Sequence, residues 1–247
     1  SEPLPFPDGA RIWHVARAGA PGTGGWSSID LQEFLLQREG QQSFETLAGF
    51  RSETYNLSSG DGPPQRLWGS AVTAEFFGLL RVQPILGRTF VAGEDQPGAP
   101  LKAVLGHAVW RDGLGGDPAV IGRSVRLNGE SAEIIGVMPP GFVFPTTDTV
   151  WVNLRLPAVG SALDPMRAVQ GVGLLREGVR PEAAATELEL GARRFRASRG
   201  LPEDDVEPMR VDRLNRAYFG GGTVPVLATL LAMTGFVLLL ACLNVAN

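Results

Sequence analysis

Short apolar runs separated by turn residues recur along the chain, and residues 50–57 alternate loosely between apolar and polar positions, as β-strands do. The predicted strands cover residues 11–16, 50–57, 66–72, 102–105, 122–127, 130–137, 150–154, 169–175 and 206–211. Two of these runs are separated by Asn128-Gly129, the strongest short signal for a β-hairpin. The pattern therefore predicts a strand-rich domain.

Apolar residues at helical spacing occur in fewer places. Asp30 and Glu33 form a capping-box pattern, which predicts the start of a helix. Ser43 is expected to begin a second helical turn, with Phe44, Leu47 and Ala48 on one side. Two short helices are predicted over residues 74–80, capped by Thr73, and over residues 107–114.

The most complete helix signal follows Arg180. Pro181 takes the first helical position and Glu182 the first turn, while arginines 193–199 lie late, in the order that the helix dipole favours. Its apolar stripe consists of Leu188, Ala192 and Phe195. The predicted order of elements is thus β-α-β, then a strand-rich middle, then β-α-β.

From Ala217 to Asn247 the chain carries no charged side chain, and Arg216 is the last charge before it. As a helix, residues 223–244 would be ~33 Å long, enough to cross a hydrocarbon core of ~30 Å. A buried core helix is the alternative, but such helices are shorter and have a polar face. We expect a transmembrane helix over residues 220–247. We also expect the chain, which starts at Ser1, to be a piece of a longer protein.

Composition narrows the possible functions. The net charge is −4, so electrostatics give no reason to expect nucleic-acid binding. Cys242 is the only cysteine and lies in the apolar segment, so the chain can form no internal disulfide and has no cysteine-based metal site. The 32 Gly and 19 Pro suit a fold with many turns.

Few residues have the types and spacing of a chemical site. His14 and His107 are the only histidines, and each lies alone in an apolar stretch, where a structural role is the expected one. The acidic run 203–205 is most simply a solvated loop, and Gly22–Gly25 lacks the ending of a phosphate loop. The five tryptophans are expected to pack in the core or at its rim. We therefore predict no catalytic, cofactor-binding or metal-ligating residue.

Several stretches, in order, resemble one bacterial family, the MacB-like periplasmic core domain of ABC transporter permeases with an FtsX-like membrane part. The likeness extends to the large permeases found as duplicated sets in acidobacteria. The stretches that carry it are Pro3-Leu-Pro-Phe-Pro7, Ser43-Phe-Glu-Thr-Leu-Ala48, Val72-Thr-Ala-Glu-Phe-Phe-Gly78, Val82-Gln-Pro-Ile-Leu-Gly-Arg-Thr-Phe90, Gly115-Gly-Asp-Pro-Ala-Val-Ile-Gly-Arg123, Leu127-Asn-Gly-Glu130, Gly136-Val-Met-Pro-Pro-Gly-Phe142 and Leu238-Leu-Leu-Ala-Cys-Leu-Asn-Val-Ala-Asn247.

The resemblance implies a fold and a place in the cell. It implies an α+β fold, in which two β-α-β halves at residues 1–62 and 161–219 form a membrane-proximal, ferredoxin-like or porter-like subdomain. It also implies an inserted strand-rich subdomain at 63–160 and a truncated transmembrane helix at 220–247, and the predicted order of elements agrees with this fold. Residues 1–219 would lie outside the cytoplasmic membrane of a bacterium. Implied partners are a cytoplasmic ABC ATPase, a second permease copy, membrane lipid, and a periplasmic adaptor or substrate protein. No cofactor and no nucleic acid are implied.

The resemblance also implies a role without catalysis, in which ATP-driven motion of membrane helices is passed to a domain outside the membrane. Two alternatives stay open from the residues alone: a membrane-anchored sensor or ligand-binding ectodomain, and a membrane-anchored enzyme. An enzyme requires titratable groups that converge in a pocket. A sensor requires a deep, preformed apolar pocket.

Overall fold

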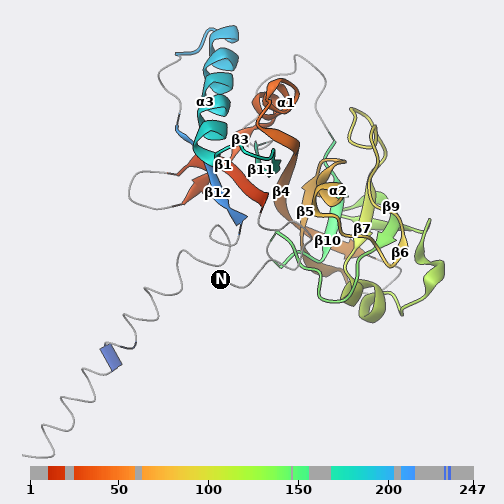
Figure 1. Cartoon of the computed structure of the whole chain (residues 1–247). Helices are drawn as coiled ribbons and strands as arrows, with labels where there is room; N and C mark the ends of the chain where they lie inside the picture. The colour runs from red at the N-terminus through yellow and green to blue at the C-terminus, as the bar shows by residue number, and fades with distance from the viewer. Residues whose placement is uncertain are drawn as a thin grey trace, which may run out of the picture.

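The computed structural model describes residues 11–19, 25–58, 63–145, 147–155, 168–202, 207–214, 231 and 233–234. One mixed sheet of twelve strands organises this part of the chain (Figure 1). The strands are β1 (Ile12–Ala18), β2 (Trp26–Ser27), β3 (Ile29–Asp30), β4 (Phe44–Ser58), β5 (Gln65–Val72), β6 (Leu86–Gly87), β7 (Lys102–Leu105), β8 (Ser124–Leu127), β9 (Glu130–Val137), β10 (Val150–Asn153), β11 (Ala168–Leu175) and β12 (Met209–Arg213). The helices are α1 (Leu31–Gly40), α2 (Phe76–Leu80), the π-helix η2 (Val109–Gly113), the 3-10 helix η3 (Pro118–Val120) and α3 (Pro181–Ser198).

The strand order is β12-β1-β11-β4-β5-β10-β7-β9-β6. Strand β8 pairs with β9 and also with the end of β4. These extra pairs close β4, β5, β10, β7, β9 and β8 into a small barrel, because each strand then has a hydrogen-bonded neighbour on both sides. Closure leaves no edge strand among these six, and the short β6 pairs with β9 outside the ring. The predicted strand-rich middle is therefore a barrel that shares β4 with the rest of the sheet.

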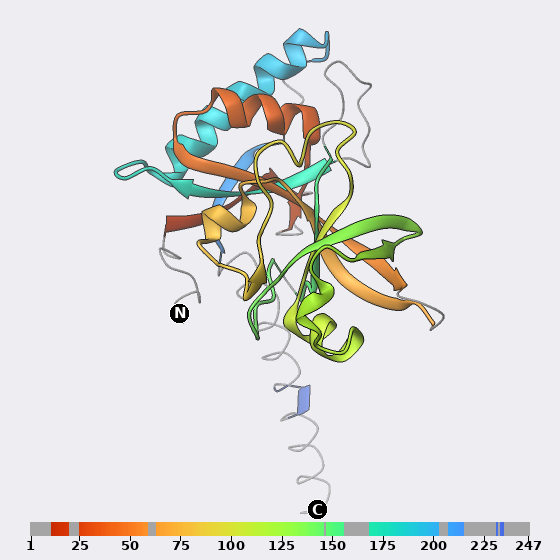
Figure 2. The same ribbon diagram turned by 90° about the vertical axis from the view of Figure 1, so that its right-hand side faces the viewer.

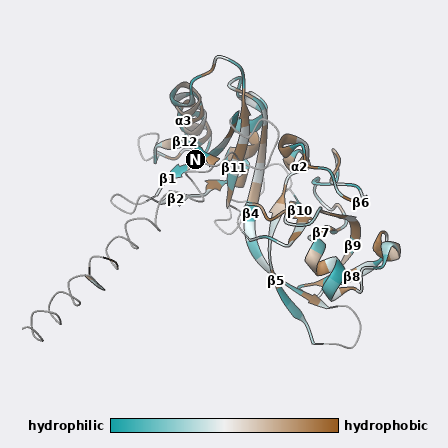
Figure 3. Ribbon diagram, turned by 60° about the horizontal axis from the view of Figure 1, so that its bottom comes forward, coloured by the Kyte–Doolittle hydropathy of each residue, from teal (hydrophilic) through white to brown (hydrophobic). Residues whose placement is uncertain are grey.

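Helices α1 and α3 lie side by side over one face of the open part of the sheet (Figures 1 and 2). Their buried residues Phe34 and Leu188 join one core, which continues into the barrel interior through Leu127 and Val152. A second core lies on the opposite face, beneath α2. It contains five phenylalanines, and Trp151 is fully buried among them. The outer end of β5, by contrast, is hydrophilic (Figure 3).

Most of the predicted elements are confirmed. The Asp30 carboxylate accepts the backbone N–H groups of Gln32 and Glu33, as an N-cap should. Asn128 and Gly129 both have positive φ, as a two-residue hairpin turn of this kind requires. In α3, the predicted apolar stripe is buried, and the order β-α-β, strand-rich middle, β-α-β is also observed.

The helical turn expected at Ser43 is wrong. Residues 44–58 form the long strand β4 instead, and its first part pairs with β11 from Phe44 to Phe50. Apolar residues at 44, 47 and 48 fit a helix face locally, but the consecutive residues of β4 from Leu47 to Phe50, which point to opposite faces of the sheet, are all buried. A strand buried on both faces loses the two-residue alternation, so periodicity alone cannot identify it.

Two smaller expectations need correction. The helix after Thr73 begins at Phe76, and its N-cap residue Glu75 makes no side-chain cap. The Thr73 hydroxyl accepts the N–H of Gly49 instead, which ties the helix approach to β4. The last strand lies at Met209–Arg213, later than the predicted 206–211.

The transmembrane helix predicted at 220–247 lies outside the described residues, except for the helical Leu231, Met233 and Thr234. Among the described residues, no helix combines the length and the apolar character needed to cross a membrane. The subdomain boundaries at 62/63, 160/161 and 219/220 stay predictions, since a single sheet runs through both subdomains.

Candidate functional site

The chain enters and leaves the domain on neighbouring strands. β1 begins at Ile12 and β12 ends at Arg213, and the two strands pair antiparallel with Trp13 opposite Arg213. Paired strands lie about 4.8 Å apart, so the segments that flank the domain start side by side. We call this β1–β12 pair the base of the domain.

Aromatic and charged side chains reinforce the base. The Arg213 guanidinium lies 5.3 Å from the Trp13 ring centroid, a cation–π contact. On the other side, the Trp26 indole donates to Asp212 at 3.1 Å, and Arg210 pairs with the same carboxylate at 2.8 Å. Strands β1, β2 and β12 are thereby joined by side chains as well as by the backbone.

His14 is buried within the base. Its Nε2 lies 2.8 Å from the Gln170 Oε1 of β11, and its ring packs edge-on against Trp26. Burial lowers the pKa of His14, because the apolar surroundings disfavour the charged imidazolium. His14 thus connects β1 to β11 through its contact with Gln170.

Side chains of helices α1 and α3 bond to the strands of the base. Arg17 of β1 forms an ion pair with the buried Glu33 of α1, and the Gln37 amide donates to Glu33 and to the Leu188 carbonyl of α3. Burial raises the pKa of Glu33, although the charge of Arg17 opposes this shift. The Glu189 carboxylate of α3 accepts the Met209 N–H of β12 at 3.1 Å.

Strand β4 connects the base to the barrel. It is 15 residues long, which corresponds to about 50 Å of extended chain. Its first part pairs with β11, and from Phe50 to Leu57 it pairs with β5 in the barrel wall. The hydrogen-bonded path from base to barrel is therefore β12-β1-β11-β4, without a break.

The barrel has a hollow at its mouth, with a volume of about 520 Å³. Its apolar lining includes Leu101, Leu127 and Val152. Its polar lining includes Tyr55 and two ion pairs, Arg51–Glu53 at 2.5 Å and Arg155–Glu130 at 2.6 Å. A second hollow of about 310 Å³ lies between α1 and α3.

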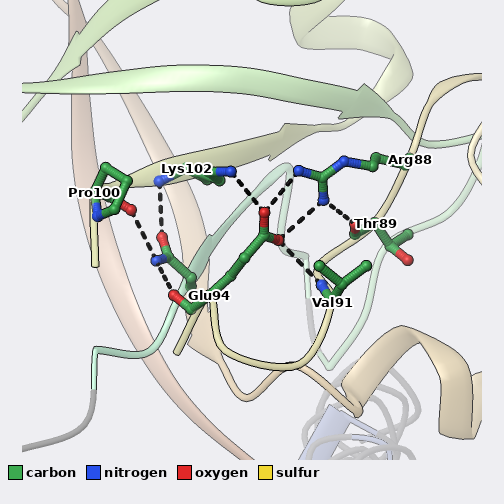
Figure 4. A network of polar contacts seen from close by, with 7 residues as sticks. Arg88, Thr89, Val91, Glu94, Pro100 and Lys102 are labelled. Atoms are coloured by element: carbon green, nitrogen blue, oxygen red, sulfur yellow. Dashed lines mark hydrogen bonds and ion pairs between the residues drawn. The ribbon is translucent and has the colours of Figure 1, made fainter. Parts of the chain in front are cut away.

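A polar network around Glu94 holds one side of the barrel mouth (Figure 4). The Glu94 carboxylate accepts hydrogen bonds from Arg88, Lys102 and the Val91 N–H. The Asn153 amide donates to the carbonyls of Glu94 and Pro100 and accepts the Lys102 N–H. The loop that lines the mouth at residues 97–101 is thus fastened to β7 and β10.

The network predicts a specific pH dependence. Burial would raise the pKa of Glu94, but the hydrogen bonds from Arg88, Lys102 and Val91 outweigh it and lower the pKa from 4.5 to about 2. A carboxylate whose pKa is lower in the folded than in the unfolded protein stabilises the fold at pH values above its unfolded-state pKa. This stabilisation is lost as the pH falls toward the folded-state pKa. We expect Glu94→Gln to lower the free energy of unfolding by about 1 kcal/mol at neutral pH, because solvent screens part of the interaction.

Denaturant titrations of both proteins from neutral pH to pH about 2 provide the measurement. The difference between wild type and variant should be constant above pH 4.5 and disappear near pH 2. Asp112→Asn is a matched control, because Asp112 and its partner Arg111 are both exposed. A difference that does not change with pH would contradict the assignment.

The other residues singled out in the sequence do not gather in one place. His107 packs edge-on against Trp110 beside the barrel, far along the strand order from His14. The acidic run 203–205 and residues 22–24 lie outside the described residues. Among the arginines of α3, Arg199 contacts the Phe195 ring and Gln32, and Arg196 donates to the Pro202 carbonyl.

The described tryptophans lie in different surroundings. Trp151 is in the core, as expected, while Trp68 is 61% exposed on β5. Within the described ranges, no cluster of three His, Cys, Asp or Glu side chains has the arrangement of a metal site.

A comparison with protein families identifies the family of this chain. The family model for the MacB-like periplasmic core domain matches residues 3–190, which is well over half of the chain. The chain belongs to the MacB-like periplasmic core domain family. The resemblance stated from the sequence motifs is confirmed. A search of curated proteins found no match.

Solved structures agree with the MacB-like fold. The periplasmic region of MacB from Actinobacillus actinomycetemcomitans is similar with a TM-score of 0.60 at 12% identity, covering 84% of this chain and 90% of that one. The extracellular domain of the noncanonic ABC-type transporter YknZ from Gram-positive bacteria gives 0.57 at 12% identity, covering 81% and 98%. A permease-protein domain from Porphyromonas gingivalis gives 0.63 at 18% identity, covering 90% and 98%.

Two features of this MacB-like domain were not found from its sequence. Glu94 has no role in the predictions from the sequence, and Tyr55 is predicted only as a residue of the strand at 50–57. Neither has a local sequence signal, because the partners of Glu94 include residues in another strand and the hollow beside Tyr55 appears only when the barrel closes.

Proposed function

We propose that this chain is the extracytoplasmic domain of an ABC transporter permease and that it transmits ATP-driven motion of membrane helices to a partner or substrate outside the membrane. The observation that supports the proposal is the pairing of β1 with β12 at the base of the domain. Because entry and exit are on paired strands, a shift of one flanking segment against the other acts directly on β1 and β12.

The sheet connects the base to the barrel, so that motion at the base can reach the barrel. Backbone hydrogen bonds continue through β1 and β11 into β4, and β4 ends in the barrel wall. Side chains at the base and the α1–α3 layer stiffen the same strands. A small movement at the base would then become a larger displacement of the barrel, which lies at the far end of the strand order.

The partners follow from this role. A cytoplasmic ABC ATPase would act through parts of the permease beyond this domain, and a second permease copy would complete the transporter. A periplasmic adaptor or substrate protein would receive the motion, membrane lipid would surround residues 220–247, and no nucleic acid takes part. The proposal also holds that no residue of the chain is catalytic. It divides the domain into the membrane-proximal and inserted subdomains at the boundaries that the sequence predicts.

Cysteine accessibility tests the placement outside the cytoplasmic membrane. In full-length protein with Cys242→Ala, a single cysteine is introduced as Gln96→Cys or Ala183→Cys, at exposed positions of the barrel loop and of α3. We expect a membrane-impermeant thiol reagent to label both positions in intact spheroplasts, as fully as it does after lysis. Labelling that requires lysis would place the domain in the cytoplasm and overturn the proposal.

A further inference from the structure

Two loops beside the second core expose apolar side chains. The first covers residues 82–87, after α2, and the second covers residues 138–145, after β9, and we call them the apolar loops. Ile85 in the first is 45% exposed and Val143 in the second is 50% exposed. Neither loop contains a charged residue. Exposed apolar side chains with no charge among them mark a surface that contacts lipid or another protein.

The apolar loops lie against each other. The Ile85 N–H donates to the Val137 carbonyl at 2.8 Å, directly before the second loop, and β6 pairs with β9. Val82 and Phe142 both pack on the second core. Figure 2 shows the two loops, in gold and green, extending together to the lower side of the domain, away from α1 and α3. They therefore form one surface.

The second core supports this surface from behind. The Phe142 ring centroid lies 5.1 Å from that of Trp151 and 6.1 Å from that of Phe77. The Trp151 indole also donates to the Phe144 carbonyl at 2.7 Å, which holds the backbone of the second loop. The exposed side chains are thus presented on a fixed backbone, so little conformational entropy is lost when they bind.

The places where the chain enters and leaves the domain favour lipid as the partner. Ile12, at the start of β1, and Leu214, directly after β12, are both buried in the second core, on which the apolar loops pack. Residues 215–222 then lead to the uncharged helix predicted at 223–244, and they span at most about 30 Å. Arg81, exposed directly before the first loop, carries the charge that anionic headgroups attract.

We propose that the apolar loops rest on the outer leaflet of the membrane, with Ile85 and Val143 at the level of the headgroups and upper acyl chains. This inference rests on the proposed function, because it requires the domain to be attached to a bilayer through residues 220–247. It makes the lipid surface a direct contact of the inserted subdomain. Because lipid is fluid, this contact lets the barrel slide along the membrane and opposes its tilting away.

Collision measurements on spin-labelled protein test the contact. The full chain with Cys242→Ala is placed in nanodiscs of phosphatidylcholine and phosphatidylglycerol, with one label at Ile85→Cys, at Val143→Cys or at the control Leu190→Cys. Leu190 is also 50% exposed, but it lies on α3. The ratio of relaxation by oxygen to relaxation by a polar nickel chelate should be about threefold or more higher at 85 and 143 than at 190, because polar solutes are excluded from apolar surroundings.

Two results would overturn the loop contact. One is a ratio at 85 and 143 equal to that at 190, and the other is protection from both reagents, which a second copy or another protein would give. A further label at Leu238→Cys, in the predicted membrane helix, separates this inference from the proposed function. Lipid exposure at 238 with water exposure at 85 and 143 overturns the loop contact alone, and water exposure at all three overturns both.

A paired substitution tests whether the two apolar side chains make the contact. With a label at the exposed Gln83→Cys, we expect Ile85→Asp with Val143→Asp to lower the oxygen-to-nickel ratio to that of the control at 190. Leu190→Asp should leave the ratio at 83 unchanged. Since both replaced side chains are exposed, the melting temperature should change little. An unchanged ratio at 83 in the folded paired variant would contradict the inference.

Discussion

Replacing Trp151 by alanine is expected to lower the free energy of unfolding by about 4 kcal/mol, the range found for large aromatic residues removed from a core. The Trp151 side chain is fully buried, and its ring centroid lies 5.1 Å from that of Phe142 and 5.8 Å from that of Phe77. Its indole also donates to the Phe144 carbonyl at 2.7 Å, so the substitution leaves a cavity and a buried acceptor without its partner.

Trp68→Ala is the matched control, because the same side chain is 61% exposed there. We expect it to cost less than about 1 kcal/mol. Denaturant titration monitored by circular dichroism gives both values. Equal losses for the two variants would show that Trp151 is not at the centre of the second core.

Gly69→Ala is expected to cost about 3 kcal/mol or more, although it adds only one methyl group. Gly69 lies in β5 opposite Val150 of β10, and a β-carbon at this position would overlap the Val150 carbonyl oxygen and press on the Tyr55 ring. Backbone cannot yield as a flexible side chain does, so the β5–β10 pairing has to shift. The barrel wall would therefore lose its register next to the mouth.

Gly78→Ala is the comparison for this effect. Gly78 lies within α2, and a β-carbon there would contact nothing. Alanine is favoured over glycine inside a helix, so the variant should be neutral or more stable by up to about 1 kcal/mol. Thermal unfolding of the two variants distinguishes steric overlap from a general loss of glycine. A stable Gly69→Ala protein would contradict the close strand packing described here.

Helices and turns that begin or end at residues with a strong local preference could be predicted from the sequence. Asp30 caps α1, Asn128-Gly129 turns the β8–β9 hairpin, and Pro181 opens α3, as predicted. Each of these signals acts over a few neighbouring residues. The order of the elements and the family motifs then led to the correct fold class, which the family match confirms.

Features made by distant residues could not be predicted in the same way. The start of β4 was wrong because its two buried faces erase the alternation of a strand, and only pairing with β11 decides its conformation. Barrel closure depends on β8 reaching the end of β4, a contact between residues 57–58 and 126–127. The hollow at the barrel mouth depends on that closure, so no spacing in the chain indicates it.

The most direct test of the account is to follow the domain through the ATPase cycle. The permease, with Cys242→Ala and Ala119→Cys beside the barrel, is spin-labelled and assembled with its ATPase in nanodiscs, and the distance between the two copies is measured by pulsed electron paramagnetic resonance. In a second sample, one copy carries both Ala119→Cys and Ala183→Cys on α3, and the other copy carries no label. We predict that ATP changes the distance between copies and leaves the distance from 119 to 183 within one domain unchanged. A distance between copies that stays constant while ATP is hydrolysed would contradict the transmission of motion through this domain.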